Sequence, residues 1–381
     1  MRVSILGAGP AGLYAAYLLR RRGLAREISI VDQNPAGATF GFGVVFSDRA
    51  LEFLQEDDQE AYARIRPALE TWEDITLNLP EETIRIDGIG FAAVGRLKLL
   101  ALLQSLVEEL DVAPVYDRHV ADLSELGEYD LLIAADGVNS LVRRTADFGT
   151  HHELLTNRFA WYGTTRRFET LTQTFKRFAD GHLNAHHYRY APDMSTFIVE
   201  VDEATYFAAG FDGMDPADAR RRLEAIFADE LQGHELVANK SDWRQFPRIS
   251  NARWFAGNRV LVGDALRTAH FSIGSGTRLA MEDVTALVRA LEEHRRDIPS
   301  ALAAYQAARQ PIVEKLVGAA NASADWYERF PEHMKLEPWR MAMSYIMRSG
   351  RVDMSRLRQV SPQFIDAFER RYGSCSGAVT P

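Results

Sequence analysis

Cysteine is nearly absent from this chain, with Cys375 the single example among 381 residues. The lack of cysteine excludes a disulfide framework and a cysteine-ligated metal site, and it is typical of the reducing cytoplasm, where we expect this protein to work. Positive charge is also scarce, because 44 lysines and arginines stand against 53 acidic residues and leave a net charge of −9. Broad binding to nucleic acid needs a basic surplus, so we expect no nucleic-acid partner.

Long apolar runs are missing too. No stretch approaches the roughly 20 apolar residues of a membrane helix, so we expect no membrane span. The opening MRVSILGAGP enters a glycine turn at once and has no cleavage-type site, which indicates a first strand rather than an export signal. With 46% hydrophobic and 25% charged residues and no internal repeat, the composition is that of a globular protein.

The first 32 residues predict a strand, a tight turn, a helix and a second strand. Residues 3–6 are apolar and run into a glycine turn, and the helix that follows ends in three arginines at residues 20–22. Residues 28–31 form the second strand, which Asp32 closes. Further pieces of the same scaffold are predicted as a helix over 96–106 and as strands over 129–134 and 260–262.

The glycine turn has the spacing of a dinucleotide-binding fingerprint. Gly7 allows the turn, Gly9 lets the backbone approach a pyrophosphate, and Gly12 packs the helix on the strand. Asp32 lies 20 residues beyond Gly12, where a carboxylate accepts hydrogen bonds from a ribose 2′-hydroxyl. The chain therefore binds a dinucleotide, although this turn does not distinguish FAD from NAD.

Between residues 159 and 201 the pattern changes to alternation and β-rich composition, in FAWYGTTRRF, NAHHYRY and STFIVEV. This pattern predicts an antiparallel sheet inserted into an α/β scaffold. We expect residues 1–155 and 245–322 to form a discontinuous Rossmann-like FAD-binding domain, 156–244 a substrate-binding β-sheet domain, and 323–381 a helical C-terminal segment.

Further segments match one known family. They are Gly41-Phe42-Gly43-Val44-Val45 with a helix from about Asp48, Arg96 at a helix start, Asp136-Gly137, and Gly263-Asp264 followed by Gly274 and Gly276. In these the chain resembles the single-component FAD-dependent aromatic hydroxylases, whose fold is that of p-hydroxybenzoate hydroxylase, over about its first 320 residues. HFSIGSGT with the basic Arg278, together with Trp72-Glu73-Asp74-Ile75, is similar to the subgroup that contains the salicylyl-CoA 5-hydroxylases and the hydroxylase part of 2-aminobenzoyl-CoA monooxygenase.

The resemblance implies FAD as cofactor, NADH or NADPH as co-substrate, and ring hydroxylation with O2 through a flavin hydroperoxide. It implies an aromatic substrate, with a CoA thioester such as salicylyl-CoA preferred. A hydroxylase of a free aromatic or indole compound, or a flavin-binding protein without hydroxylase activity, stays open as an alternative. The residues expected to contact FAD are Gly7, Gly9, Ala11, Gly12, Asp32, Gly41, Gly43, Val44, Arg96, Asp136, Asp264, Gly274, Gly276 and Thr277.

The chain departs from the wider family just before the second glycine loop. Phe271 stands where the family has proline, and Arg267 stands where the subgroup would have histidine. We expect His270 to hydrogen-bond or deprotonate the ring substituent, since the pKa of histidine suits that exchange. The alternative is a histidine that only bridges backbone groups of the loop. Phe271 is expected to form a wall against the ring or, equally, a core aromatic.

The segment NAHHYRY places a second set of candidates on one strand face. Alternation puts His186, Tyr188 and Tyr190 on one side and His187 and Arg189 on the other. We expect His186 and Tyr188 to roof the substrate pocket and the opposite face to meet solvent or a neighbouring sheet, while an ordinary amphipathic strand is the alternative. Adjacent histidines point in opposite directions, so we expect no metal site.

A CoA thioester would require arginines at the pocket mouth to bind its phosphates. The candidates are Arg166 with Arg167, Lys176 with Arg177, and the three arginines at 220–222. Solvated faces that balance the many carboxylates are the alternative for each of these pairs and runs. The oligomeric state does not follow from the sequence.

Overall fold

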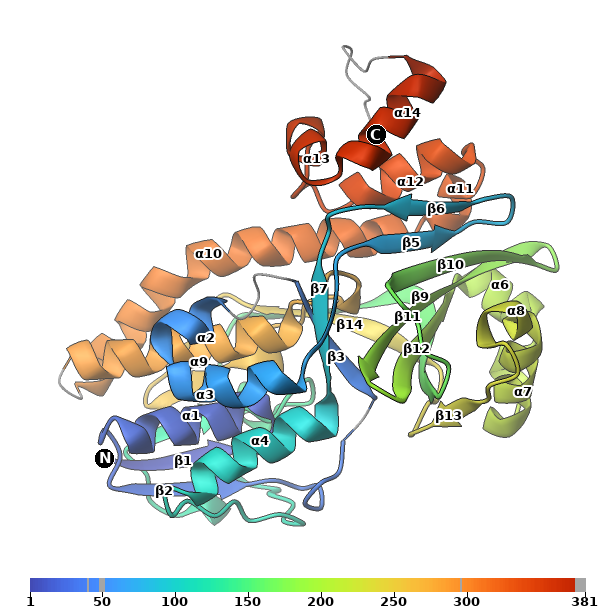
Figure 1. Ribbon diagram of the computed structural model, residues 1–381. Helices are drawn as coiled ribbons and strands as arrows, with labels where there is room; N and C mark the ends of the chain where they lie inside the picture. The colour runs from blue at the N-terminus through green and yellow to red at the C-terminus, as the bar shows by residue number, and fades with distance from the viewer. Residues whose placement is uncertain (40, 48–51, 295–296, 374–381) are drawn as a thin grey trace.

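The computed structural model describes residues 1–39, 41–47, 52–294 and 297–373 (Figure 1). Cys375 and the start of the helix expected from about Asp48 lie outside these residues. The first region of the fold is a five-stranded sheet in the order β15-β16-β8-β1-β2. Its strands are β1 (Arg2–Leu6), β2 (Glu27–Val31), β8 (Leu131–Ala134), β16 (Arg259–Leu261) and β15 (Phe255–Ala256), and all pair in parallel except the antiparallel β15.

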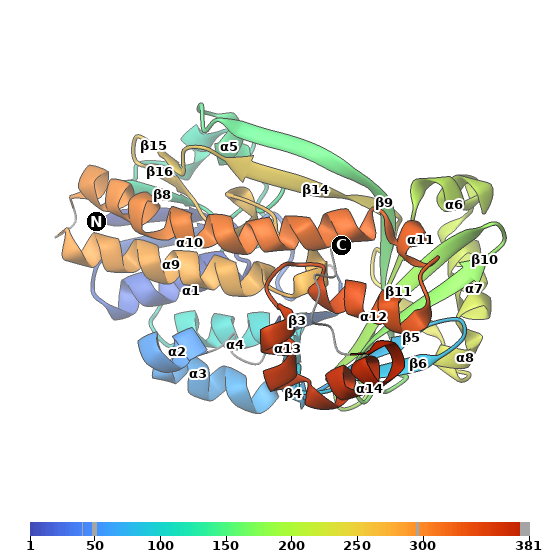
Figure 2. The same cartoon turned by 90° about the horizontal axis from the view of Figure 1, so that it is seen from above.

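Helices cover this sheet and bury its apolar strands. The helices α1 (Pro10–Arg21), α4 (Arg96–Glu108) and α9 (Gly276–Glu293) pack together, and the long α10 (Ile298–Tyr327) lies along α9 (Figure 2). Pro299 stands in the first turn of α10, where its missing N–H costs nothing. The predicted Rossmann-like region is therefore confirmed, and shorter helices α2 (Glu52–Asp57), α3 (Gln59–Ile65) and α5 (Leu141–Arg144) complete it.

The second sheet has the order β13-β9-β12-β11-β10-β5-β6, and β14 also pairs with β9. The three predicted segments are the antiparallel neighbours β9 (Thr150–Thr164), β12 (Met194–Val201) and β11 (Gly181–Ala191). The remaining strands are β10 (Leu171–Phe178), β5 (Ile75–Asn78), β6 (Thr83–Ile86), β13 (Leu236–Ala238) and β14 (Arg244–Asn251).

This sheet extends beyond the segment 156–244 that the sequence predicts. β5 and β6 come from within residues 1–155, and β5 pairs in parallel with β10. β9 also begins at Thr150, and β14 continues past residue 244. Hydrogen bonding to strands distant in the chain decides which segments join a sheet, so a boundary drawn from local composition differs from the sheet that forms.

Helices bury the part of the outer face of the large sheet that β9, β11 and β12 form. Its cover includes α6 (Glu203–Ala208), α7 (Pro216–Ile226) and α8 (Ala228–Leu231), whose apolar residues join those of β9, β11 and β12 in one core. His187 points to this side and stacks on Phe197 at 5.0 Å. The expectation that this strand face meets solvent or another sheet is therefore wrong at His187, which packs in this core, whereas Arg189 on the same face borders a surface groove.

A small third sheet and the C-terminal helices connect the two regions. The third sheet has the order β3 (Gly43–Ser47), β7 (Phe91–Gly95) and β4 (Glu70–Trp72). The predicted C-terminal helical segment forms α11 (Phe330–His333), α12 (Pro338–Met347), α13 (Met354–Val360) and α14 (Pro362–Tyr372), which lie over β5 and β6 (Figure 1). These helices share an apolar core with β5, β6 and β10, so this segment buries one edge of the large sheet.

Candidate active site

A cavity of about 660 Å³ lies between the carboxyl ends of β1, β2, β8 and β16 and the inner face of the large sheet. This is the edge at which open α/β sheets bind their ligands. The residues predicted from the sequence that border it are Gly7, Gly9, Ala11, Asp32, Gly43, Val44, Arg96, Asp136, Asp264, Gly274, Gly276 and Thr277 for the cofactor, and His186, Tyr188 and Phe271 for the substrate. Gly12, Gly41 and His270 are not among the residues that border it.

The turn between β1 and α1 has the geometry of a phosphate site. Gly7 has a φ of +101°, which favours glycine, and α1 presents its N-terminus to the cavity. A Cβ atom added to Gly9 would meet no other atom within 4 Å, so the turn leaves open space beside that residue. The carboxylate of Asp32 accepts from the N–H groups of Ala8 at 2.7 Å and Asn34 at 2.8 Å.

Two predicted glycines act through packing instead. A Cβ on Gly12 would lie 1.9 Å from the carbonyl oxygen of Gly7, so only glycine lets α1 approach the turn this closely. A Cβ on Gly41 would lie 3.1 Å from the indole of Trp161. Both residues therefore shape the cavity from behind its wall.

Charges of both signs face the middle of the cavity. Burial lowers the pKa of Arg96, which Asp264 and then Tyr188 raise, and burial raises the pKa of Asp264, which Arg96 and then Arg267 lower. Asp136 Oδ1 and Ser275 Oγ are buried and have no hydrogen-bond partner within the described part of the chain. A dinucleotide would give these polar atoms partners, so the residues present fit FAD.

The other end of the cavity is aromatic. Phe271 lies 5.0 Å from Phe159 and 6.0 Å from Phe246, measured between ring centroids, and Trp161 lies 6.4 Å from Phe271. The hydroxyl of Tyr188 donates to the carbonyl oxygen of Gly43 at 3.1 Å. An apolar pocket with few polar groups suits a flat aromatic ring held against the cofactor.

His186 is buried at this end and has partners at both ring nitrogens. Its Nδ1 lies 2.7 Å from Gln173 Nε2, and its Nε2 lies 3.3 Å from Glu200 Oε2. Burial, and to a smaller extent the charge of Arg348, lower the pKa of His186 to about 3, so the ring is neutral near pH 7. Burial raises the pKa of Glu200, while His270 and then Asn157 lower it.

His270 lies behind the cavity wall. Its Nδ1 lies 2.8 Å from Ser272 Oγ and accepts from the N–H of Ser272 at 3.4 Å, where it caps the short helix η5 (Phe271–Ile273). Burial lowers the pKa of His270 to about 4, while the nearby Glu200 raises it. This position favours the loop-bridging alternative over direct contact with the substrate.

Several bordering residues were not predicted from the sequence. Phe159 and Trp161 on β9 and Ile198 on β12 share the face that holds His186, so strand alternation could have found them. Gln173 required recognition of β10, whose segment LTQTFKRF alternates weakly. Tyr345 and Arg348 come from the C-terminal segment, and no local pattern places them beside the cavity.

The departure at Arg267 has a structural explanation. Its Nη1 lies 2.6 Å from Asp283 Oδ2 in a buried ion pair, and its guanidinium lies over the ring of Trp254. Asp283 also accepts from Arg309 Nε at 3.1 Å. Arg267 therefore anchors α9 to the turn that carries Asp264.

The arginines proposed for CoA phosphates lie on the far side of the large sheet or on its surface. Lys176 pairs with Glu230 at 2.7 Å, and Arg177 pairs with Glu81 at 2.6 Å. Arg167 lies 3.7 Å from Glu169, Arg220 lies 3.9 Å from Glu224, Arg221 pairs with Asp218, and Arg222 lies over the rings of Phe178 and Phe211. The positions of these residues favour the solvated-face alternative.

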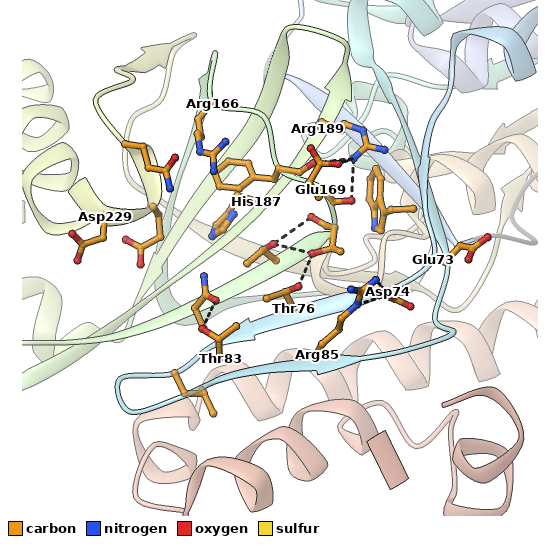
Figure 3. Close-up of a pocket in the computed structure, with 18 of the residues that line it drawn as sticks. Glu73, Asp74, Thr76, Thr83, Arg85, Arg166, Glu169, His187, Arg189 and Asp229 are labelled. Atoms are coloured by element: carbon orange, nitrogen blue, oxygen red, sulfur yellow. Dashed lines mark hydrogen bonds and ion pairs between the residues drawn. The ribbon is translucent and has the colours of Figure 1, made fainter. Parts of the chain in front are cut away.

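Arg166 borders a separate groove of about 800 Å³ on this far face (Figure 3). Acidic side chains outnumber basic ones there, and Arg189 is already paired with Glu70 at 2.8 Å. Arg85 is paired with Asp74. A polyanion such as CoA would meet repulsion in this groove.

None of the described helices combines the length and apolarity that crossing a bilayer requires. No group of three or more His, Cys, Asp and Glu side chains within residues 1–39, 41–47, 52–294 and 297–373 is arranged to hold a metal ion.

Comparison with known proteins agrees with this geometry. A family described as "FAD binding domain" matches residues 108–320, and an NAD(P)-binding Rossmann-like domain matches residues 5–40. The chain is 38% identical to a salicyloyl-CoA 5-hydroxylase of Streptomyces sp, over 92% of this chain and 70% of that protein. It is 36% identical to the 3-hydroxy-4-methyl-anthranilyl-[aryl-carrier protein] 5-monooxygenase of Streptosporangium sibiricum, over 87% and 90%.

Solved structures show the same fold at lower identity. Pseudomonas aeruginosa PqsL in complex with 2-aminobenzoylacetate aligns with a TM-score of 0.67 at 20% identity, over 86% of this chain and 96% of that one. The fold, the cavity and these relatives agree on one assignment. The chain belongs to the FAD-dependent aromatic hydroxylases and is a flavoprotein monooxygenase that uses FAD and NAD(P)H.

Proposed function

We propose that this monooxygenase hydroxylates the ring of an aryl thioester, with salicylyl-CoA as the representative substrate. The observation that carries the proposal is the pair of relatives above, whose names place an aryl-CoA in one and an aryl-carrier protein in the other. Both are thioesters of hydroxylated or aminated benzoic acids. The near-absence of cysteine leads us to propose a cytoplasmic enzyme as well.

When bound, FAD takes electrons from NAD(P)H and activates O2 for insertion of one oxygen atom into the ring. The residues of the chain place and enclose the reactants. Arg96 and Asp264 would hold the cofactor, while Phe159, Trp161 and Phe271 would hold the aromatic ring and exclude water.

The phosphates of CoA would bind to two arginines of the C-terminal segment, Arg348 and Arg351. Arg348 borders the cavity and donates to Ser323 Oγ at 3.0 Å and to the carbonyl oxygen of Ser272 at 3.0 Å. Arg351 follows three residues later and is exposed, yet the surrounding protein and then the like charge of Arg278 lower its pKa. Within the described chain, neither Arg348 nor Arg351 has a carboxylate partner, so an anion would find unneutralised charge here.

The test compares thioester with free acid. Purified FAD-loaded enzyme is given NADH or NADPH with salicylyl-CoA or with salicylate, and both nicotinamide oxidation and hydroxylated product are measured. Product from the thioester with little from the free acid supports the proposal, and product from the free acid only refutes it. A free aromatic compound, such as the protodeoxyviolaceinate that names another relative, is the second candidate, because the chain is also 32% identical to protodeoxyviolaceinate monooxygenase of Chromobacterium violaceum, over 91% of this chain and 94% of that protein.

A further inference from the structure

The polar end of the substrate pocket contains a buried chain of hydrogen bonds in which His186 is an internal member. Gln173 and Glu200 occupy its two ring nitrogens, as described above. A histidine bonded in this way has no nitrogen left for a ligand. Another group must therefore provide the polar contact to the ring substituent.

The donor and acceptor roles along this chain of hydrogen bonds can be assigned from Asn157. Its Nδ2 donates to the backbone carbonyl of Tyr327 at 2.8 Å, and a carbonyl can only accept, which fixes the orientation of the amide. The same Nδ2 donates to Glu200 Oε1 at 2.9 Å. When Glu200 is ionised, its Oε2 can only accept, so His186 donates from Nε2 and its Nδ1 is an acceptor.

That tautomer sets the orientation of Gln173. Because Nδ1 of His186 accepts, the atom of Gln173 at 2.7 Å must be the amide nitrogen. The other end agrees, since the hydroxyl of Tyr327 donates to Gln173 Oε1 at 3.2 Å. His186 borders the cavity and Tyr327 does not, so the nitrogen end of the amide is the end beside the substrate.

We propose that Gln173 orients the substrate by donating its remaining amide N–H to an oxygen atom on the aromatic ligand, and that Glu200 acts through His186 as a positioning residue that fixes this donor. The oxygen atom is either the phenolic oxygen or the acyl carbonyl oxygen. The proposal rests on the aromatic substrate of the proposed function, and it does not depend on the thioester.

The decisive variant is Glu200→Gln, which changes almost no volume. Asn157 would hold the new amide oxygen at the Oε1 position, so the new amide nitrogen would donate to His186 Nε2. His186 would then carry its proton on Nδ1, and Gln173 would have to turn its oxygen toward His186. A lone pair would replace the N–H beside the ligand.

The experiment measures ligand binding to FAD-loaded protein through the change in flavin absorbance. The ligands are salicylate, salicylyl-CoA, benzoate and benzoyl-CoA. We expect Gln173→Leu to weaken the binding of salicylate and salicylyl-CoA about tenfold, because one hydrogen bond is lost. Glu200→Gln should weaken their binding at least as much. If the oxygen is phenolic, benzoate and benzoyl-CoA are unaffected, and if it is the acyl oxygen, they weaken equally.

The double variant separates this role from general damage. In the Gln173→Leu background, Glu200→Gln should cause no further loss of binding, because the amide that it reorients is gone. Unchanged salicyl binding in Glu200→Gln, or additive losses in the double variant, would overturn the proposal. If only the thioester proposal is wrong, the protein will bind salicylate but not salicylyl-CoA. The variants can then still be compared with salicylate, so the role of Gln173 is tested separately.

Discussion

A Cβ atom on Gly12 would lie 1.9 Å from the carbonyl oxygen of Gly7, whereas a Cβ on Gly9 would meet nothing within 4 Å. Gly9 also has a φ of −75°, which alanine adopts freely. Two glycines of one turn therefore have different physical roles. Gly12 is needed for the fold of the apoprotein, and Gly9 leaves open space in which we expect a phosphate of the cofactor to bind.

We predict that Gly9→Ala and Gly12→Ala separate folding from FAD binding. Gly9→Ala should leave the free energy of unfolding of the apoprotein unchanged or raise it by about 0.5 kcal/mol, and should weaken FAD at least about tenfold. Gly12→Ala should lower that free energy by about 3 kcal/mol, because backbone must move. Urea unfolding of the apoprotein and FAD titration measure both. Equal losses of stability in the two variants would contradict this division.

The buried pair of Arg267 and Asp283 predicts an asymmetric effect of substitution. Asp283→Asn removes the negative charge that pairs with the buried guanidinium groups of Arg267 and Arg309, and should lower the free energy of unfolding by about 3–5 kcal/mol. Arg267→Met should cost less, because Arg309 still pairs with Asp283 and the methionine fills the space beside Trp254. Chemical denaturation measures the stability of both variants. A larger loss of stability in Arg267→Met than in Asp283→Asn would contradict the prediction that Asp283 is the more important member of the pair.

Buried neutral histidines predict acid sensitivity. Burial first, and then His186 and Arg166, lower the pKa of His187 to about 3, whereas an unfolded histidine has a pKa near about 6.5. The unfolded state therefore binds more protons below about pH 6.5, and stability falls as the pH falls from there toward 3. Between pH 6.5 and 5, the free energy of unfolding of His187→Gln should fall by about 2 kcal/mol less than that of the wild type, as measured by urea unfolding. The control is the range above about pH 7.5, where His187 binds no proton in either state and the variant and the wild type should show the same pH dependence.

His270 allows a test of its two interpretations. If it only caps η5, His270→Asn should keep FAD binding and the coupling of NADH oxidation to product, because an asparagine oxygen also caps a helix start. His270→Ala should lower stability by about 1 kcal/mol. Loss of coupling in both variants, with FAD still bound, would instead favour proton exchange between His270 and the substrate.

The thioester proposal predicts a selective effect at Arg351. Arg351→Ala should raise the KM for salicylyl-CoA by about tenfold, the loss of one charge-assisted contact, without changing the KM for a free aromatic acid. Arg371 is a matched control, because it is a surface arginine that pairs with Glu337 at 3.2 Å. An equal rise for both kinds of substrate would place Arg351 outside the thioester site.

Local sequence patterns correctly predicted one helix and two strands of the first sheet region. The helix expected over 96–106 is α4, and the strands expected over 129–134 and 260–262 are β8 and β16. Each combines a periodic apolar pattern with a glycine or a charge at its end. The weakly alternating β10 was missed, and so was its parallel pairing with β5, because that pairing joins residues 96 positions apart.

Short motifs with local geometry were enough to predict the α/β class, the dinucleotide turn at Gly7, Gly9 and Gly12, and the family of flavin-dependent hydroxylases. Packing of distant segments was needed to show that His270 lies behind the cavity wall, that Arg267 pairs with Asp283, and that Gln173 and Arg348 border the cavity. Such contacts join side chains far apart in the chain. Burial and hydrogen bonding select them only after the sheets and the C-terminal helices have packed.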